Sequence, residues 1–238
     1  MFMQVLVSVS SVQEAELALS AGVRLIDLKE TSYGALAALD LDVSRAIVAT
    51  VDSYRLQHPG IDIIISATIG DDCTSATAFT QLTEPRCNMG VDVIKLPEAI
   101  WAKADCQAGI TELLAGHCRL IAVLSPVTLS EKDKLESILH DLAKQGYWGV
   151  MVDTIKKSQP LPALLGLNVL ADFVRLAKSL NLYVGLAGGL YIEQFEQLAA
   201  IAPDYLGFRS GLCVNQQREQ PLIQEKVHLL VEKLSQIC

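Results

Sequence analysis

The sequence predicts an α/β protein that forms one (β/α)8 barrel, a single TIM-barrel domain over residues 1–238. Short apolar runs rich in Val and Ile recur eight times, and segments with helical spacing separate them. Eight such units fit this length, because barrels of this kind typically need about 250 residues. A doubly wound open sheet is the alternative, but it usually has fewer strands, and no GxGxxG motif follows the first apolar run.

The eight expected strands are continuously apolar for most of their length, as parallel strands covered on both faces must be. Their charged and polar residues gather at the ends of the runs. In chain order the strands are expected at residues 4–9, 24–28, 61–68, 91–96, 120–124, 149–152, 182–186 and 205–208.

Apolar residues at the i, i+3, i+4, i+7 spacing predict one-sided helices between these strands. The clearest sets are Leu135/Ile138/Leu139/Leu142, Phe173/Leu176/Ala177/Leu180 and Val227/Leu230/Val231/Leu234. Helix starts are expected at Ser11, which forms a capping-box pattern with Glu14, and at Ser130, which precedes a Glu-rich turn. Helix ends are expected at Gly22, Gly90 and Gly146.

Composition narrows the class of protein. The formal net charge is −8 and the pI is about 5.0, so a nucleic acid would be repelled. The 51% apolar content indicates a folded core, and no stretch is long and apolar enough to span a membrane. The N-terminus lacks the basic start of a signal peptide. Six cysteines without CxxC spacing favour buried thiols in a reducing cytoplasm over disulfides or zinc.

Charged residues stand at the expected strand exits, which converge on one pocket in a barrel. Asp27 and Lys29 end the second strand and share a face, Lys95 ends the fourth, and Asp153 follows the sixth. A lysine buried beside another cation has a lowered pKa, and its free amine can form a Schiff base with a carbonyl while aspartates move protons. The alternative is that these residues form plain ion pairs, and that Lys156 and Lys157 lie in a solvated loop.

Glycines follow the last two strands, where barrels frequently bind phosphate. The residues concerned are Gly188, Gly189, Arg209, Ser210 and Gly211. Backbone N–H groups there could approach an anion and Arg209 could add a charged contact, although tight turns alone would also need glycine. We therefore expect a small phosphorylated carbonyl substrate. No metal or cofactor is expected, because the four histidines fall on predicted helices without ligand spacing.

The chain resembles the (5-formylfuran-3-yl)methyl phosphate synthase family, also called 4-(hydroxymethyl)-2-furancarboxaldehyde-phosphate synthase. The resemblance runs from the first strand to the last and rests on the stretches 26–29, 66–71, 93–95, 151–154, 186–188 and 207–209. It implies a TIM-barrel lyase of methanofuran biosynthesis without a metal. Such a lyase joins two molecules of glyceraldehyde 3-phosphate through a lysine imine, losing phosphate and water.

The resemblance also implies a role for each candidate residue. It places the Schiff-base lysine on Lys29, its neighbouring aspartate on Asp27, and a second essential lysine on Lys95. The remaining aspartate is Asp153, and the lysine four residues beyond it is Lys157. Residues 30–38 and 213–218 depart from the family pattern, and the second departure leaves the contacts of a second phosphate unassigned.

Two other functions stay open from the sequence. One is a class I, Schiff-base aldolase acting on another small sugar phosphate, and the other is a catalytically silent barrel that serves as a binding subunit. We also expect a homo-oligomer, because the apolar segments 35–41 and 161–170, taken as helices, would leave apolar surface to bury.

Overall fold

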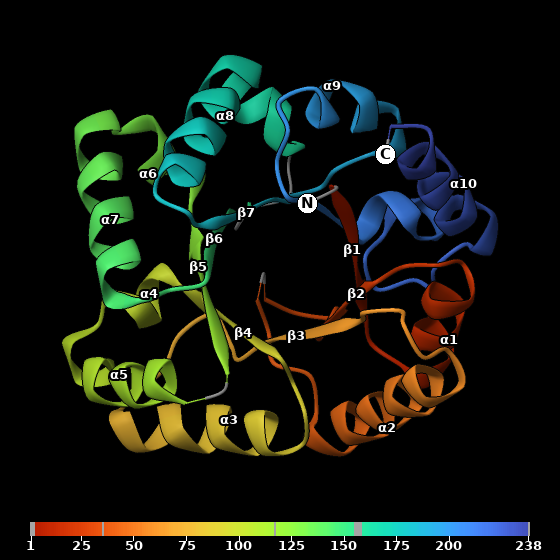
Figure 1. Cartoon of the computed structure of the whole chain (residues 1–238), viewed down its shortest axis with the longest axis horizontal. Coiled ribbons are helices and arrows are strands. Elements are labelled where there is room, and N and C mark those ends of the chain that lie inside the picture. Colours follow the sequence, from red (N-terminus) through yellow and green to blue (C-terminus); the bar gives the residue numbers. More distant parts are fainter. Residues whose placement is uncertain (1–2, 35, 117, 155–158, 238) are drawn as a thin grey trace.

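The computed structural model is a closed barrel of eight parallel strands, each hydrogen-bonded to the next in chain order, with β8 closing onto β1 (Figure 1). It describes residues 3–34, 36–116, 118–154 and 159–237. Helices form a ring outside the strands, as Figure 1 shows. The predicted (β/α)8 architecture is therefore confirmed.

The strands follow the apolar runs closely. They are β1 Gln4–Val9, β2 Leu25–Leu28, β3 Ile64–Thr68, β4 Val93–Pro97, β5 Arg119–Leu124, β6 Gly149–Val152, β7 Tyr183–Leu186 and β8 Tyr205–Phe208. The largest difference is at β3, which begins at Ile64 because Ile61 donates to the carbonyl of His58 in a turn. Burial on both faces therefore identified the strands, whereas turns set where they begin.

Helices and short 3-10 segments connect the strands. The α-helices are α1 Val12–Ser20, α2 Leu41–Gln57, α3 Ala76–Asn88, α4 Glu98–Trp101, α5 Gln107–Ala115, α6 Pro126–Ser130, α7 Lys132–Gln145, α8 Leu161–Ser179, α9 Phe195–Ala199 and α10 Gln224–Ser235. The 3-10 segments are η1 Ala104–Cys106, η2 Ile192–Gln194, η3 Ser210–Leu212 and η4 Val214–Gln216. The three sets of i, i+3, i+4, i+7 residues fall on α7, α8 and α10, except that Leu180 is the C-cap of α8.

Some of the predicted helix ends are confirmed and one is wrong. Ser11 caps α1 by accepting from the amide of Glu14, but the Glu14 carboxylate accepts from Ser10 instead of closing a capping box. Ser130 is wrong as a cap, because it ends α6 and donates to the carbonyl of Pro126. Gly22, Gly90 and Gly146 follow helix ends with positive φ, as predicted.

The predicted apolar helix over 35–41 is wrong. Helix α2 begins only at Leu41, because the carboxylate of Asp40 caps its first amides. Leu36 and Leu39 are buried against this chain and are not surface for a partner. Self-association accordingly stays a prediction, and of the two apolar segments only 161–170 still supports it.

Two cores form because side chains alternate along each strand. In β1, Val5, Val7 and Val9 point outward and pack against the helices, whereas Leu6 faces into the barrel. The inner core also contains Tyr205, which stacks on Tyr183 near the start of the strands. Apolar side chains thus fill the lower barrel, and the polar residues of the interior lie toward the strand ends.

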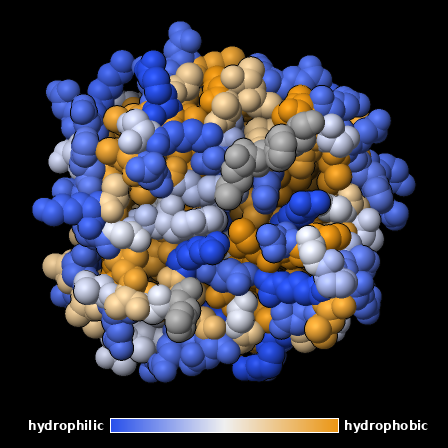
Figure 2. Space-filling view, in the orientation of Figure 1, coloured by the Kyte–Doolittle hydropathy of each residue, from blue (hydrophilic) through white to orange (hydrophobic). Residues whose placement is uncertain are grey.

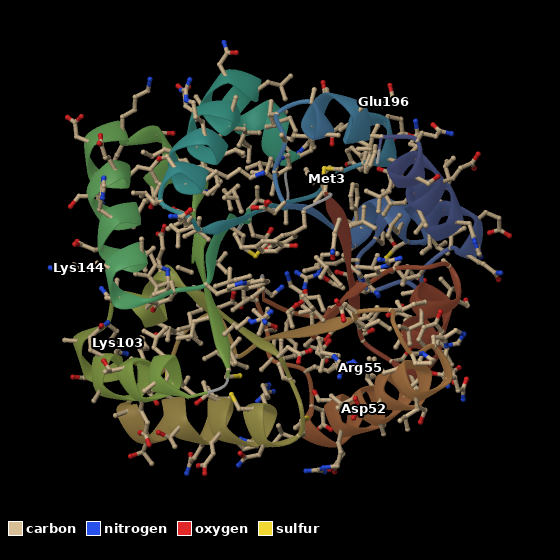
Figure 3. The ribbon with its side chains drawn as sticks, viewed as in Figure 1. Met3, Asp52, Arg55, Lys103, Lys144 and Glu196 are labelled. Atoms are coloured by element: carbon tan, nitrogen blue, oxygen red, sulfur yellow. The ribbon has the colours of Figure 1, made fainter. Side chains whose placement is uncertain are left out.

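The face seen in Figure 2 is hydrophilic over most of its periphery. Arg55 and Asp52 lie beside each other on α2 (Figure 3), and Arg55 also pairs with Asp92 just before β4. This contact ties an outer helix to the end of the barrel where the strands begin. Among the described residues, no helix is long and apolar enough to cross a membrane.

Candidate functional site

Inward-facing positions at the strand ends bring the candidate residues together. Strand register aligns Ser8 with Asp27 and Asp27 with Ser66, so three polar side chains of β1, β2 and β3 lie side by side. Lys95 is aligned with Thr68 of β3 in the same way. The two-residue period of a strand places Asp27 and Lys95 on the face that carries Leu25 and Val93 into the inner core.

Asp27 and Lys95 form a fully buried ion pair. Lys95 Nζ lies 2.5 Å from Asp27 Oδ1, and both side chains are about 1% exposed. The carboxylate also accepts from the hydroxyls of Ser8 and Ser66, each at 2.8 Å. Burial lowers the pKa of Lys95; Asp27 opposes that shift and the nearby Lys29 adds to it. Lys95 can therefore release a proton more readily than an exposed lysine can.

Lys29 forms the second buried pair, with Asp153 across the barrel mouth. Its Nζ lies 3.2 Å from Asp153 Oδ2, and both side chains are less than a tenth exposed. Asp153 Oδ1 accepts from the amide of Thr154, which fixes the carboxylate at the end of β6. Asp27 and Lys29 share a face as predicted, but each pairs with a residue from another strand. Two ammonium groups and two carboxylates thus meet where a substrate carbonyl could enter.

The glycines after β7 border the same site. Gly188 and Gly189 have φ of +113° and +62°, and their amides donate to no acceptor among the described residues. A Cβ at Gly188 would lie 2.6 Å from the Thr154 side chain, so only glycine fits there. Both glycines and Ser210 line a hollow of about 20 Å³ with the two lysines and two aspartates. Gly211 is buried under the carbonyl of Leu190, outside that lining.

Arg209 lines this hollow, but its guanidinium is heavily bonded within the chain. Its Nη1 lies 2.6 Å from Glu14 Oε2 and also donates to the carbonyl of Ser8. Its Nε and Nη2 donate to the carbonyls of Arg218 and Gln220. The structure therefore places Arg209 as a support for the segment after β8, and its contact with a phosphate stays a prediction.

A larger cleft of about 520 Å³ opens beside the hollow and shares Asp153 with it. Loops after β2, β3, β4, β5 and β6 line the cleft, together with Arg218 and Glu219 from beyond β8. Arg218 donates to the carbonyls of Gly34 and Glu30 and so bridges the mouth of the barrel. Burial lowers the pKa of Arg218, an effect that Asp153 opposes.

Sequence reasoning missed four residues of this region. Ser8 and Ser66 hold Asp27, Thr154 packs against Gly188, and Arg218 lines the cleft. The two serines carry a signal that could have found them, since each is a polar residue in an otherwise apolar strand. Lys157 and its neighbour Lys156 lie outside the described residues. Within the described ranges, no cluster of three or more His, Cys, Asp or Glu side chains could hold a metal ion.

A family model described as 4-HFC-P synthase matches residues 5–231 of this chain. The chain belongs to the (5-formylfuran-3-yl)methyl phosphate synthase family. An Archaeoglobus fulgidus member with that name is 30% identical over 97% of this chain and 98% of its own length. A Methylorubrum extorquens protein that carries the name provisionally is 37% identical over 97% and 91%. The resemblance drawn from the strand exits is thereby confirmed, and with it that this chain is an enzyme by family.

Solved structures agree with the fold of this (5-formylfuran-3-yl)methyl phosphate synthase family member. Phosphoribosyl anthranilate isomerase from Thermus thermophilus matches 99% of this chain and 100% of its own, with a TM-score of 0.63 and 16% identity. The 3-hexulose-6-phosphate synthase of Salmonella typhimurium matches the same shares with a TM-score of 0.62 and 13% identity. At such identities the likeness concerns the barrel alone.

Proposed function

We propose that this protein is a lyase that condenses two molecules of glyceraldehyde 3-phosphate into (5-formylfuran-3-yl)methyl phosphate through a Schiff base on Lys29. The product would serve the biosynthesis of a methanofuran-type cofactor. Family membership supports the product, and the chemistry of the barrel mouth supports the route.

The observation that carries the proposal is the pair of buried ion pairs at the strand ends. An amine captures an aldehyde only as the free base, and the protonated imine that follows needs an anion beside it. Lys29 supplies an amine and Asp153 an anion, with Lys29 Nζ 3.2 Å from Asp153 Oδ2. Lys95, 1% exposed beside them, supplies a second amine that gives up its proton readily.

The contacts favour Lys29 over Lys95 as the nucleophile. Lys95 is held at 2.5 Å by a carboxylate that two serine hydroxyls also fix, so it cannot swing toward a substrate without leaving that pair. Lys29 makes a longer contact and lies just beyond the end of β2, whereas Lys95 lies within β4. Lys95 with Asp27, and Asp153, would then relay protons during imine formation, enamine attack, phosphate elimination, ring closure and dehydration.

The phosphate of the imine-bound triose would lie against Gly188 and Gly189. Their amides have no acceptor among the described residues and their φ is positive, so they give backbone donors beside the lysines; Ser210 lines the same hollow. Arg209 and Gly211 belong to this proposed phosphate site through the loop after β8: Arg209 lines the hollow and fixes the loop, and Gly211 lies in the loop outside the hollow. Lys157 joins the proton relay in this proposal on the strength of the family resemblance.

Borohydride reduction in the presence of glyceraldehyde 3-phosphate tests the proposal. Mass spectrometry should locate a triose adduct on Lys29, and the unreduced reaction should release a furan aldehyde that absorbs in the near ultraviolet. Lys29→Arg keeps a cation beside Asp153 but cannot form an imine, so it should lose both signals. Lys144→Arg, on the exposed face of α7, is the matched control and should keep both.

Each other outcome contradicts a specific part of the proposal. An adduct on Lys29 with an aldol sugar as product would identify a class I aldolase instead. An adduct on Lys95, or furan formation retained in Lys29→Arg, would remove the assignment of the nucleophile. Absence of both adduct and product in the wild type would favour a silent binding subunit.

A further inference from the structure

We infer that Arg218 and the cleft it borders form a second phosphate subsite, which holds the second triose while the first is bound at Lys29. The inference rests on the proposed function for the identity of that triose. The cleft of about 520 Å³ lies on the β2–β6 side of the mouth, whereas the glycine loops after β7 line the smaller hollow. Asp153 lines both spaces, so two substrates placed in them would meet at the reacting groups.

The guanidinium of Arg218 is held firmly and yet keeps donors to spare. Nη1 donates to the carbonyl of Gly34 at 2.6 Å and Nη2 to the carbonyl of Glu30 at 3.0 Å. A guanidinium has five N–H donors, and no other acceptor among the described residues takes one from Arg218. Its Nε is buried and has no hydrogen-bond partner within the part of the chain that the structure describes, which costs free energy unless a ligand accepts from it.

A second arginine fixes the segment that carries Arg218. Arg209 donates to the carbonyls of Arg218 and Gln220, and its own charge is neutralised by Glu14. The Glu14 carboxylate also accepts from the amide of Leu222, so both ends of the segment are tied to α1. Arg218 therefore reaches over the mouth from a preorganised backbone, as a binding residue must to keep its affinity.

The described part of the cleft offers a phosphorylated hydroxyaldehyde one cation and four carboxylates, those of Asp71, Glu98, Asp153 and Glu219. Arg218 is the one basic side chain among the described residues of the lining, so it is the natural contact for a phosphate there. Two of the lining carboxylates are engaged: Asp71 accepts from the amide of Leu36, and Glu98 accepts from the amide of Ser125. The hydroxyl of Thr154 is buried and has no partner among the described residues, which leaves it for a substrate oxygen.

Two readouts on one variant separate the second subsite from the first. In Arg218→Gln, the glyceraldehyde 3-phosphate concentration that half-saturates furan formation should rise at least about tenfold, the effect of losing a charge-assisted hydrogen bond. Borohydride trapping at Lys29 should stay within about twofold of the wild type. Arg218→Lys keeps the positive charge but loses the planar guanidinium, so its half-saturating concentration should lie between those of the wild type and Arg218→Gln. Arg175→Gln on the exposed side of α8 is the control.

A second experiment uses the wild-type protein and therefore does not depend on whether a variant folds. It measures how far a ligand protects Arg218 from chemical modification. Phenylglyoxal modifies accessible arginines, and glycerol 3-phosphate should slow its reaction with Arg218 by the factor 1 + [L]/Kd, where Kd is that of the probe. Glycerol, which lacks the phosphate, should not slow it, and Arg175 should react equally in all cases.

Two results would overturn the subsite. One is an equal loss of trapping and of furan formation in Arg218→Gln, which indicates a structural role. The other is unchanged modification of Arg218 in glycerol 3-phosphate. If the wild type traps no triose at Lys29, the proposed function fails, and the protection experiment alone decides the subsite.

Discussion

Replacing Lys95 with methionine tests how much the ion pair between Lys95 and Asp27 contributes to stability. The substitution keeps most of the length of the side chain but removes the ammonium that lies 2.5 Å from Asp27 Oδ1. Among the described residues, the buried Asp27 carboxylate would keep only the hydroxyls of Ser8 and Ser66 as hydrogen-bond partners. Breaking a buried ion pair by removing one partner costs about 3–5 kcal/mol. Because the two hydroxyl contacts survive, we expect a loss near the lower limit, about 3 kcal/mol of unfolding free energy.

The double variant Asp27→Asn with Lys95→Met decides whether that loss comes from the stranded charge. The amide introduced by Asp27→Asn is neutral; its oxygen can accept from one serine hydroxyl and its NH2 group can donate to the other. The double variant should therefore be more stable than Lys95→Met by about 1 kcal/mol or more. Urea unfolding with linear extrapolation measures the difference. Lys144→Met, a change at a side chain that points away from the barrel (Figure 3), should stay within about 0.5 kcal/mol of the wild type.

Two outcomes would refute the reasoning about this pair. If Lys95→Met unfolds at the same urea concentration as the wild type, the ammonium does not offset the buried carboxylate. If the two substitutions simply add, so that the double variant is the least stable of the set, the side chains are not energetically coupled and the contact carries no net stabilisation.

Two further predictions concern pH and the support of the cleft. The lowered pKa of Lys95 means that, between that pKa and about 10.4, the folded state binds fewer protons than the unfolded state, so stability rises with pH. As pH rises through that window, the urea midpoint of the wild type should increase relative to that of the Asp27→Asn, Lys95→Met double variant. A difference between the two midpoints that stays constant or shrinks would contradict the lowered pKa of Lys95. Glu14→Gln strands the buried Arg209 guanidinium and should lower unfolding free energy by roughly 3 kcal/mol, with weaker protection of Arg218 by glycerol 3-phosphate. Unchanged stability and protection would show that Glu14 does not hold the segment.

Most of the barrel could be predicted because its strands are buried on both faces. β1, β6 and β8 begin and end at the predicted residues. The prediction of a helix in the segment before α2 is wrong, because apolar residues are as common there as in a buried helix. Leu36 and Leu39 are buried in a loop that packs over the barrel, and local sequence does not distinguish the two ways of burying leucine.

The candidate site divides in the same way. Asp27, Lys29, Lys95 and Asp153 could be found because the ends of parallel strands must converge, whatever the rest of the chain does. The place of Arg209 could not, because Glu14, which binds its guanidinium, lies 195 residues away in the chain. The position of Arg218 could not be predicted for the same reason. Its contacts with Gly34 and Glu30 depend on how two loops cross the mouth of the barrel, and the pattern of apolar residues carries no information about that.

The charges in the upper barrel lie where stability alone would favour Val, Ile or Leu, the residues that usually fill such interiors. Burying two ion pairs gives little or no net stability over apolar residues of similar volume. Each pair nevertheless has a distinct environment. Asp27 is bonded on three sides and holds Lys95, whereas Asp153 faces a cleft and pairs more loosely with Lys29. The contacts thus hold Lys95 more tightly than Lys29, which is the division of roles that the proposed imine chemistry requires and a structural ion pair does not.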